Sequence, residues 1–275
     1  MNSALRPATL LALLLGAAAA VAAENPPSTV GSITRNNGLQ KDRFIYVKTP
    51  GIFQVDKSKQ EAPPPPDAHA AIAHYERAAQ ESPDPLIRAE SLRRAADLRL
   101  QLADTGEDDY DAASVRQAIA AYQRILADYP GYFGNDRVLY QLARAQQLDG
   151  QAEVAIETLR TLGRRYPDSP RMGDAEFRAA ELLYARGRYE EAEPEYRKVL
   201  SQGAGAPYFE PAQYKYGWAL YKQAKYREAL PQFLAILERD LPQPAPEEPA
   251  AAVEAMAPAR REFGGDALRV AGLSF

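Results

Sequence analysis

Apolar residues recur every three or four positions between residues 67 and 242, the spacing that gathers them on one face of an α-helix. The pattern is clearest in three segments, Asp136 to Leu148, Asp174 to Ala185 and Glu210 to Gln223. Each segment is followed by a small residue and then by a second helical segment. The small residues are Gly150, Gly187 and Ala224. Glycine supplies the positive φ angle of a tight turn, so the pattern predicts pairs of helices joined by short turns.

These helical pairs repeat with a period of 37 residues. Alanine occupies one position of every second helix, and a larger residue follows four positions later. The two series are Ala118, Ala155, Ala192 and Ala229, and Tyr122, Leu159, Tyr196 and Phe233. An earlier copy, Ala71 to Pro83, lies 47 residues before its successor because the acidic insertion Ala103 to Ser114 separates them. A repeat of this kind buries its apolar face only against its neighbours, so we expect an all-α stack over residues 67–242.

The segments outside this stack have different compositions. Residues 1–23 are typical of a secretory signal peptide, with Arg6, an apolar run and a small-residue site at Val21-Ala22-Ala23. Residues 24–66 are Pro-rich and predicted to be mostly irregular. Residues 243–264 form a Pro/Ala/Glu-rich linker that we expect to build no core. Residues 265–275 resemble the start of a further, truncated repeat, which predicts that the chain is a fragment of a longer protein.

Composition excludes several classes of chemistry. The net charge of -4 gives no reason to expect nucleic acid as a partner. Cysteine is absent, which excludes a thiol nucleophile, a Cys-ligated metal and a lipid anchor on cysteine. The two histidines, His69 and His74, lie in one helix at a spacing that does not pair metal ligands. We therefore expect no catalytic residues, no cofactor and no metal, and the apolar runs predict no transmembrane span.

The repeat pattern resembles the tetratricopeptide repeat family. That family places Trp-x2-Leu-Gly-x2-Tyr in the first helix and Ala-x3-Phe in the second. The fourth unit reads Gln213-x2-Tyr216-Gly217-x2-Leu220 and then Ala229-x3-Phe233. The resemblance covers residues 67–242 and implies a right-handed α-solenoid whose first helices line a concave groove that binds peptides.

The segment Arg165 to Tyr196, with its Tyr-Pro-Asp-Ser-Pro loop, looks like exported tetratricopeptide proteins of Gram-negative envelopes. These include the outer-membrane assembly factor D family and the Tol–Pal coordinator family. The resemblance implies a periplasmic, non-enzymatic scaffold that binds a partner protein or peptide. One alternative is an accessory protein that handles peptidoglycan or surface polysaccharide through exposed aromatic rings. A third class, an enzyme domain, could lie beyond Phe275.

One helical segment, residues 210–237, holds four tyrosines and the only tryptophan. Tyr216, Tyr226 and Phe233 are expected to pack in the core. The stripe that faces the groove in the resembled family is expected to bind the partner. Its members are Tyr140, Arg144, Phe177, Glu181, Tyr184, Tyr214, Trp218 and Tyr221.

Export can be tested at the cleavage site. Because Val21-Ala22-Ala23 fits a small-x-small signal, we expect the mature chain to begin at Glu24, or at Ala23 if cleavage follows Ala22. N-terminal sequencing of the product from a periplasmic fraction checks this expectation. A cytoplasmic product that retains Met1 would contradict it.

Overall fold

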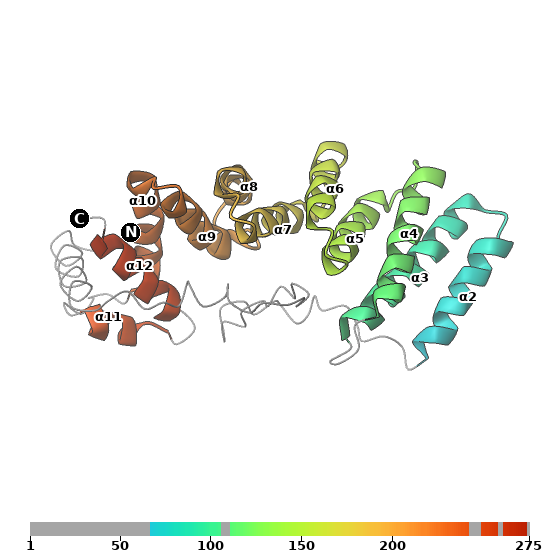
Figure 1. The fold of residues 1–275 in the computed structure, drawn as a ribbon, viewed down its shortest axis with the longest axis horizontal. Helices are drawn as coiled ribbons and strands as arrows, with labels where there is room; N and C mark the ends of the chain where they lie inside the picture. The colour runs from blue at the N-terminus through green and yellow to red at the C-terminus, as the bar shows by residue number, and fades with distance from the viewer. Residues whose placement is uncertain (1–66, 106–110, 242–248, 258–260, 274–275) are drawn as a thin grey trace. The chain divides into compact units, whose positions relative to one another are not determined.

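The computed structural model describes residues 67–105, 111–241, 249–257 and 261–273, and every regular element in these ranges is an α-helix (Figure 1). The all-α prediction is confirmed. The helices fall into two compact units. The N-terminal unit (residues 67–187 with 205–208) contains α2 to α7, and the C-terminal unit (residues 188–204 with 209–273) contains α8 to α12. The expected signal peptide and the Pro-rich segment 24–66 lie outside the described residues.

Consecutive helices of the N-terminal unit pack against each other, and α3 also contacts α5. The helices are α2 (Ala68–Glu81), α3 (Pro85–Thr105), α4 (Ala112–Asp128), α5 (Asn135–Leu148), α6 (Ala152–Arg165) and α7 (Met172–Ala185). Aspartates cap three of them, and at α3 the Asp84 carboxylate accepts the Leu86 amide at 2.8 Å. The Asp67 carboxylate accepts the Ala70 amide at 2.9 Å, and Asp111 accepts the amides of Ala113 and Ser114. Such caps satisfy amides that have no partner within the helix.

The C-terminal unit contains α8 (Tyr189–Ser201), α9 (Phe209–Lys222), α10 (Tyr226–Asp240), α11 (Pro249–Ala255) and α12 (Arg261–Leu273). Helix α9 packs between α8 and α10, and α12 packs on α10 and α11. One apolar core joins α9, α10, α11 and α12, with Phe233, Leu237 and Leu268 among its buried members.

The alanine series and its two companion series are buried in every repeat. No member is more than 3% exposed. They are Ala118, Ala155, Ala192 and Ala229; Tyr122, Leu159, Tyr196 and Phe233; and Ile125, Leu162, Val199 and Ile236. The 37-residue period therefore identifies the positions that hold each second helix in its core.

The structure differs from expectation in the C-terminal stretch. Pro249 opens a short helix inside the predicted linker, and Ala252 and Met256 are buried in the core. Proline is tolerated in the first turn of a helix, and the alanines that follow favour helix formation. Helix α12 begins at Arg261, before the predicted start at residue 265. Gly264 lets Met256 approach closely, since a Cβ there would lie 2.0 Å from the Met256 sulfur.

The turns that follow α5, α7 and α9 share one backbone conformation. Gly150 and Gly187 have φ angles of 77° and 73°, and Ala224 has a φ angle of 59°. The amide of Lys225 donates to the Leu220 carbonyl at 3.0 Å, which satisfies an orphan carbonyl at the end of α9. Ala224 adopts this left-handed conformation despite its Cβ, which is sterically unfavourable.

We expect Ala224→Gly to raise the free energy of unfolding by about 0.5–1 kcal/mol, because glycine removes the Cβ strain at a small cost in unfolded-state entropy. The matched substitution Gly187→Ala should lower the free energy of unfolding by about 1 kcal/mol, since a Cβ there meets no atom within 4 Å and only the backbone is strained. Urea denaturation of both variants measures the two changes. Changes of the same sign would show that the shared turn conformation is not the cause.

Candidate functional site

The residues predicted to bind a partner lie on the first helix of each repeat. Helices α5, α7 and α9 carry them at positions 37 residues apart. The three sets are Tyr140, Arg144 and Gln147; Phe177, Glu181 and Tyr184; and Tyr214, Trp218 and Tyr221. We call these positions the A-helix face. Those on α5 and α7 belong to the N-terminal unit, and those on α9 belong to the C-terminal unit.

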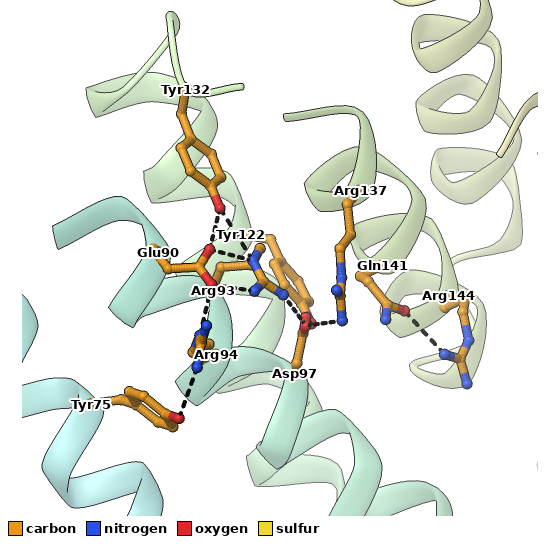
Figure 2. Close-up of polar contacts among 10 residues, drawn as sticks. All are labelled: Tyr75, Glu90, Arg93, Arg94, Asp97, Tyr122, Tyr132, Arg137, Gln141 and Arg144. Atoms are coloured by element: carbon orange, nitrogen blue, oxygen red, sulfur yellow. Dashed lines mark hydrogen bonds and ion pairs between the residues drawn. The ribbon is translucent and has the colours of Figure 1, made fainter. Parts of the chain in front are cut away.

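Helix α3 carries three charged residues on one face, Glu90, Arg93 and Asp97, which we call the α3 charge cluster (Figure 2). The Arg93 side chain is only 8% exposed. Its Nη2 lies 2.6 Å from a Glu90 oxygen, and its Nη1 lies 2.5 Å from an Asp97 oxygen. A buried guanidinium is tolerated only when carboxylates compensate its lost hydration, and here two carboxylates do so.

Later elements of the N-terminal unit complete this cluster. The Tyr132 hydroxyl, from the loop between α4 and α5, donates to Glu90. The Tyr122 hydroxyl of α4 donates to Asp97 at 2.7 Å, and Arg137 of α5 donates to Asp97 at 2.8 Å (Figure 2). The cluster therefore ties α3 to the two helices that follow it.

The pKa values of this cluster shift toward the charged forms. Partial burial alone would raise the pKa of Glu90, but hydrogen bonds from Arg93, Tyr132 and Arg94 outweigh it and lower that pKa to about 2. Burial would lower the pKa of Arg93, but its bonds to Glu90 and its attraction to Asp97 raise it. The Glu90–Arg93 ion pair thus stays charged across the whole neutral and mildly acidic range.

The α3 charge cluster extends the A-helix face to the first repeat. Tyr122 and Phe233 are members of one buried series, and each contacts the first helix of its own pair. Tyr122 contacts Asp97, whereas the Phe233 ring lies 5.6 Å from the Trp218 ring. Asp97 therefore occupies on α3 the place that Trp218 occupies on α9. The sequence interpretation missed this cluster, although its acid–base–acid spacing along one helical face was visible.

Helix α5 presents a polar stripe beside the cluster. Arg137, Gln141 and Arg144 follow one another along the helix in Figure 2. The Gln141 side chain is buried, and its amide oxygen accepts the Arg144 Nη1 at 3.0 Å. Arg144, a predicted binding residue, is partly exposed. The buried amide therefore orients a guanidinium that remains accessible.

Tyr140, another predicted binding residue, is only 6% exposed. Its hydroxyl donates to Asp174 of α7 at 2.5 Å. The guanidinium groups of Arg171 and Arg178 lie 5.7 and 5.6 Å from the centre of its ring. Burial raises the pKa of Tyr140 to about 12. These contacts give the ring a packing role between α5 and α7, and they leave little of it for a partner.

Helix α7 carries one buried and two accessible members of the face. Phe177 is 8% exposed and stacks on Tyr208, with ring centres 5.0 Å apart. Glu181 and Tyr184 are partly exposed. Among the three members on α7, Glu181 and Tyr184 therefore offer surface for recognition.

The aromatic residues of α9 make contacts within the C-terminal unit. The Tyr214 hydroxyl donates to Asp266 of α12 at 2.6 Å. The Trp218 ring meets Tyr214 and Tyr221 edge to face, at 6.3 and 5.4 Å. All three rings are partly exposed and also pack against the apolar core. These residues thus support the fold, and their predicted role in binding stays a prediction.

The three residues expected to pack in the core differ in how deeply they are buried. Phe233 is fully buried, as expected. Tyr216 is partly exposed and lies under Arg197, whose guanidinium is 6.0 Å from the ring centre. Tyr226 is 48% exposed. Helical spacing alone does not separate these cases, because burial of Tyr216 and Tyr226 depends on the neighbouring helices.

Two absences hold for the described residues. No group of three or more His, Asp or Glu side chains among them could hold a metal ion. None of the helices in the described ranges is long and apolar enough to cross a membrane. The A-helix positions on α5, α7 and α9 carry charged, amide and aromatic side chains.

The charge of Glu90 should stabilise the protein in a pH-dependent way. Its pKa is lowered from 4.5 to about 2, so its contribution is complete above pH 4.5 and is lost as the pH falls toward 2. We expect Glu90→Gln to lower the free energy of unfolding by about 2 kcal/mol at neutral pH, discounted because the carboxylate is partly exposed.

This deficit should shrink as the pH approaches 2. Urea denaturation across the pH range measures it, with Glu76→Gln as the control, because Glu76 forms a more exposed pair with Arg99. A deficit independent of pH would show that the carboxylate charge is not what stabilises α3.

Comparison with known proteins supports a repeat family. Residues 105–179 match the family model of the tetratricopeptide repeat. No curated protein matches the chain.

Three solved structures resemble the chain at low identity. MamA from AMB-1 is 19% identical, with 60% of this chain and 92% of that chain covered and a TM-score of 0.38. A Podosopora anserina structure with nearly identical TPR-like repeats is 18% identical, with 70% and 97% covered and a TM-score of 0.43. BtubC from P. vanneervenii is 15% identical, with 74% and 87% covered and a TM-score of 0.46. Residues 105–179 are thus similar to the tetratricopeptide repeat.

Proposed function

We propose that the chain is a non-enzymatic scaffold of the bacterial cell envelope whose A-helix face binds a segment of a partner protein. The match to the tetratricopeptide repeat supports a role in protein–protein interaction. In the N-terminal unit, the partner segment would contact the partly exposed side chains of Arg144, Glu181 and Tyr184.

One observation carries the proposal. The repeats share the same buried alanine, but they differ in the side chains that they place on the A-helix face. The alanine series is identical and fully buried in all four repeats. At one position of the A-helix face, the same period gives Arg144, Glu181 and Trp218, which are all partly exposed. Packing does not require a cation, an acid and an indole at equivalent positions. A fixed backbone with varied side chains is what selective recognition of a protein surface needs.

The ring geometry favours a protein over a polysaccharide as the partner. Stacking on sugars needs exposed, roughly parallel rings. The Trp218 ring stands at 80° to Tyr214 and at 77° to Tyr221. Phe177 and Tyr208 are close to parallel, but Phe177 is buried. Edge-to-face aromatic clusters are common in protein cores and interfaces.

The envelope location rests on the sequence alone. The signal-like residues 1–23 and the envelope-type loop after α6 support export to the periplasm. The absence of cysteine supports a protein without a lipid anchor on that residue.

Site-specific photocrosslinking tests the proposal. A photoreactive phenylalanine analogue replaces Arg144 or Glu181 on the A-helix face, and Arg124 of α4 in a control. Arg124 is 64% exposed and lies on a second helix. After crosslinking in periplasmic extract, we expect the same protein band from both A-helix positions and not from position 124.

The captured protein then allows a quantitative test. We expect Arg144→Ala to weaken its binding about tenfold with an unchanged melting temperature, because exposed arginines often dominate interfaces. Arg124→Ala should leave binding unchanged. Equal crosslinking from all three positions, or the lack of any crosslinked protein, would contradict the proposal.

A further inference from the structure

The hairpin between α9 and α10 exposes aromatic surface at its tip. The Tyr221 and Tyr226 rings meet edge to face, with centres 5.1 Å apart. Tyr226 is 48% exposed, which makes it one of the few large apolar side chains that the described residues present to solvent. An exposed ring of this size adds apolar surface to the protein, and aromatic side chains are enriched at interfaces.

Two exposed cations flank these rings. Lys222 ends α9, and Arg227 follows Tyr226 in α10. The structure gives neither of them an ion pair or hydrogen bond within the part of the chain that it describes. The nearby Lys225 differs, because its Nζ lies 2.7 Å from Glu193. We call Tyr221, Lys222, Tyr226 and Arg227 the hairpin patch.

Only this repeat carries both cations, although Arg116 holds the position of Arg227 three periods earlier. Residues 211–227 contain four Lys or Arg residues and no Asp or Glu. One period earlier, the positions of Lys222 and Arg227 hold Ala185 and Glu190, although both tyrosine positions keep tyrosine. The local positive charge stands out in a chain whose net charge is -4. Neither the period nor core packing requires these cations.

We infer that the hairpin patch binds an acidic segment of a partner protein, with an apolar or aromatic side chain of that segment seated on Tyr226 and its carboxylates paired with Lys222 and Arg227. The inference rests on the proposed scaffold function and gives the chemistry of the partner segment that contacts the C-terminal unit. Opposite charges across an interface speed the encounter and fix its register.

An acidic peptide suits this patch better than a polyanion. Proteins that bind nucleic acid neutralise many phosphates at once, about 6–10 in the salt-sensitive DNA-binding proteins. The patch offers two free cations beside two aromatic rings. The negative charge of the chain would also repel a long polyanion. A short segment with a few carboxylates and one apolar anchor matches both features.

The experiment uses a fluorescent synthetic peptide of Asp and Glu with two phenylalanines. Its twin has Asn and Gln in place of the acids, and heparin is the polyanion probe. Fluorescence anisotropy compares the full mature chain with Lys222→Gln/Arg227→Gln. The matched control is Arg116→Gln/Arg124→Gln, which removes two exposed cations from α4 and changes the net charge equally.

We expect the acidic peptide to bind the wild type and the α4 control alike, and about tenfold more weakly to the hairpin variant. Binding should weaken with salt, and the neutral twin should bind no better than background. Equal binding of the two peptides, equal loss in the α4 control, or tighter binding of heparin would overturn the inference.

The crosslinked partner separates this inference from the proposed function. If Lys222→Gln/Arg227→Gln leaves the captured protein bound as before, the inference fails while the scaffold proposal stands. If no protein is captured from the A-helix face at all, the scaffold proposal fails.

Discussion

Burial of a small residue at one position in each second helix is the constraint on which the rest of the structure depends. Ala118, Ala155, Ala192 and Ala229 are fully buried, and a larger side chain there would have to displace its neighbours. The larger residue four positions later fills the space beside it, as Phe233 does against Trp218. Because interiors are packed to crystal-like density, this pair of positions leaves little freedom in how helices of a repeat meet. The A-helix face inherits its regularity from that packing.

Side-chain hydrogen bonds between the first helices of successive repeats also hold the repeats together. Tyr140 donates to Asp174 in the N-terminal unit, and Tyr214 donates to Asp266 in the C-terminal unit. Both bonds pair a tyrosine in the middle of one first helix with an aspartate near the start of another. One period after Tyr140 and Asp174, the equivalent positions hold Phe177 and Pro211, which carry neither a hydroxyl nor a carboxylate. Each pair of positions therefore has either both polar groups or neither of them. This is expected because a buried hydroxyl or carboxylate without a partner would be costly.

Sequence periodicity was sufficient to predict the helices and their buried residues, but it did not predict the contacts of the candidate site. The period identified the buried series, and the predicted helices begin within two residues of Asn135, Met172 and Phe209. Local spacing placed Tyr140 and Tyr214 on the A-helix face, but their bonds depend on aspartates 34 and 52 residues away. The burial of Arg93 likewise depends on Tyr132, 39 residues later. Charges on a helix are usually solvated, and only the folded arrangement shows that these are enclosed. Helix α11 was missed because a proline-rich composition hid an alanine run that suits a helix.

The α3 charge cluster also bears on how such a chain can change its number of repeats. Arrays of this kind grow and shrink by duplicating or deleting whole helical pairs, which is harmless where neighbouring interfaces are interchangeable. Glu90, Arg93 and Asp97 are matched to Tyr132 and Arg137, which come from the loop and helix that immediately follow α4. A repeat inserted at that junction would separate these groups and leave enclosed charges without their partners, at a cost of several kcal/mol. The junction between the α3–α4 pair and the α5–α6 pair is therefore fixed in register.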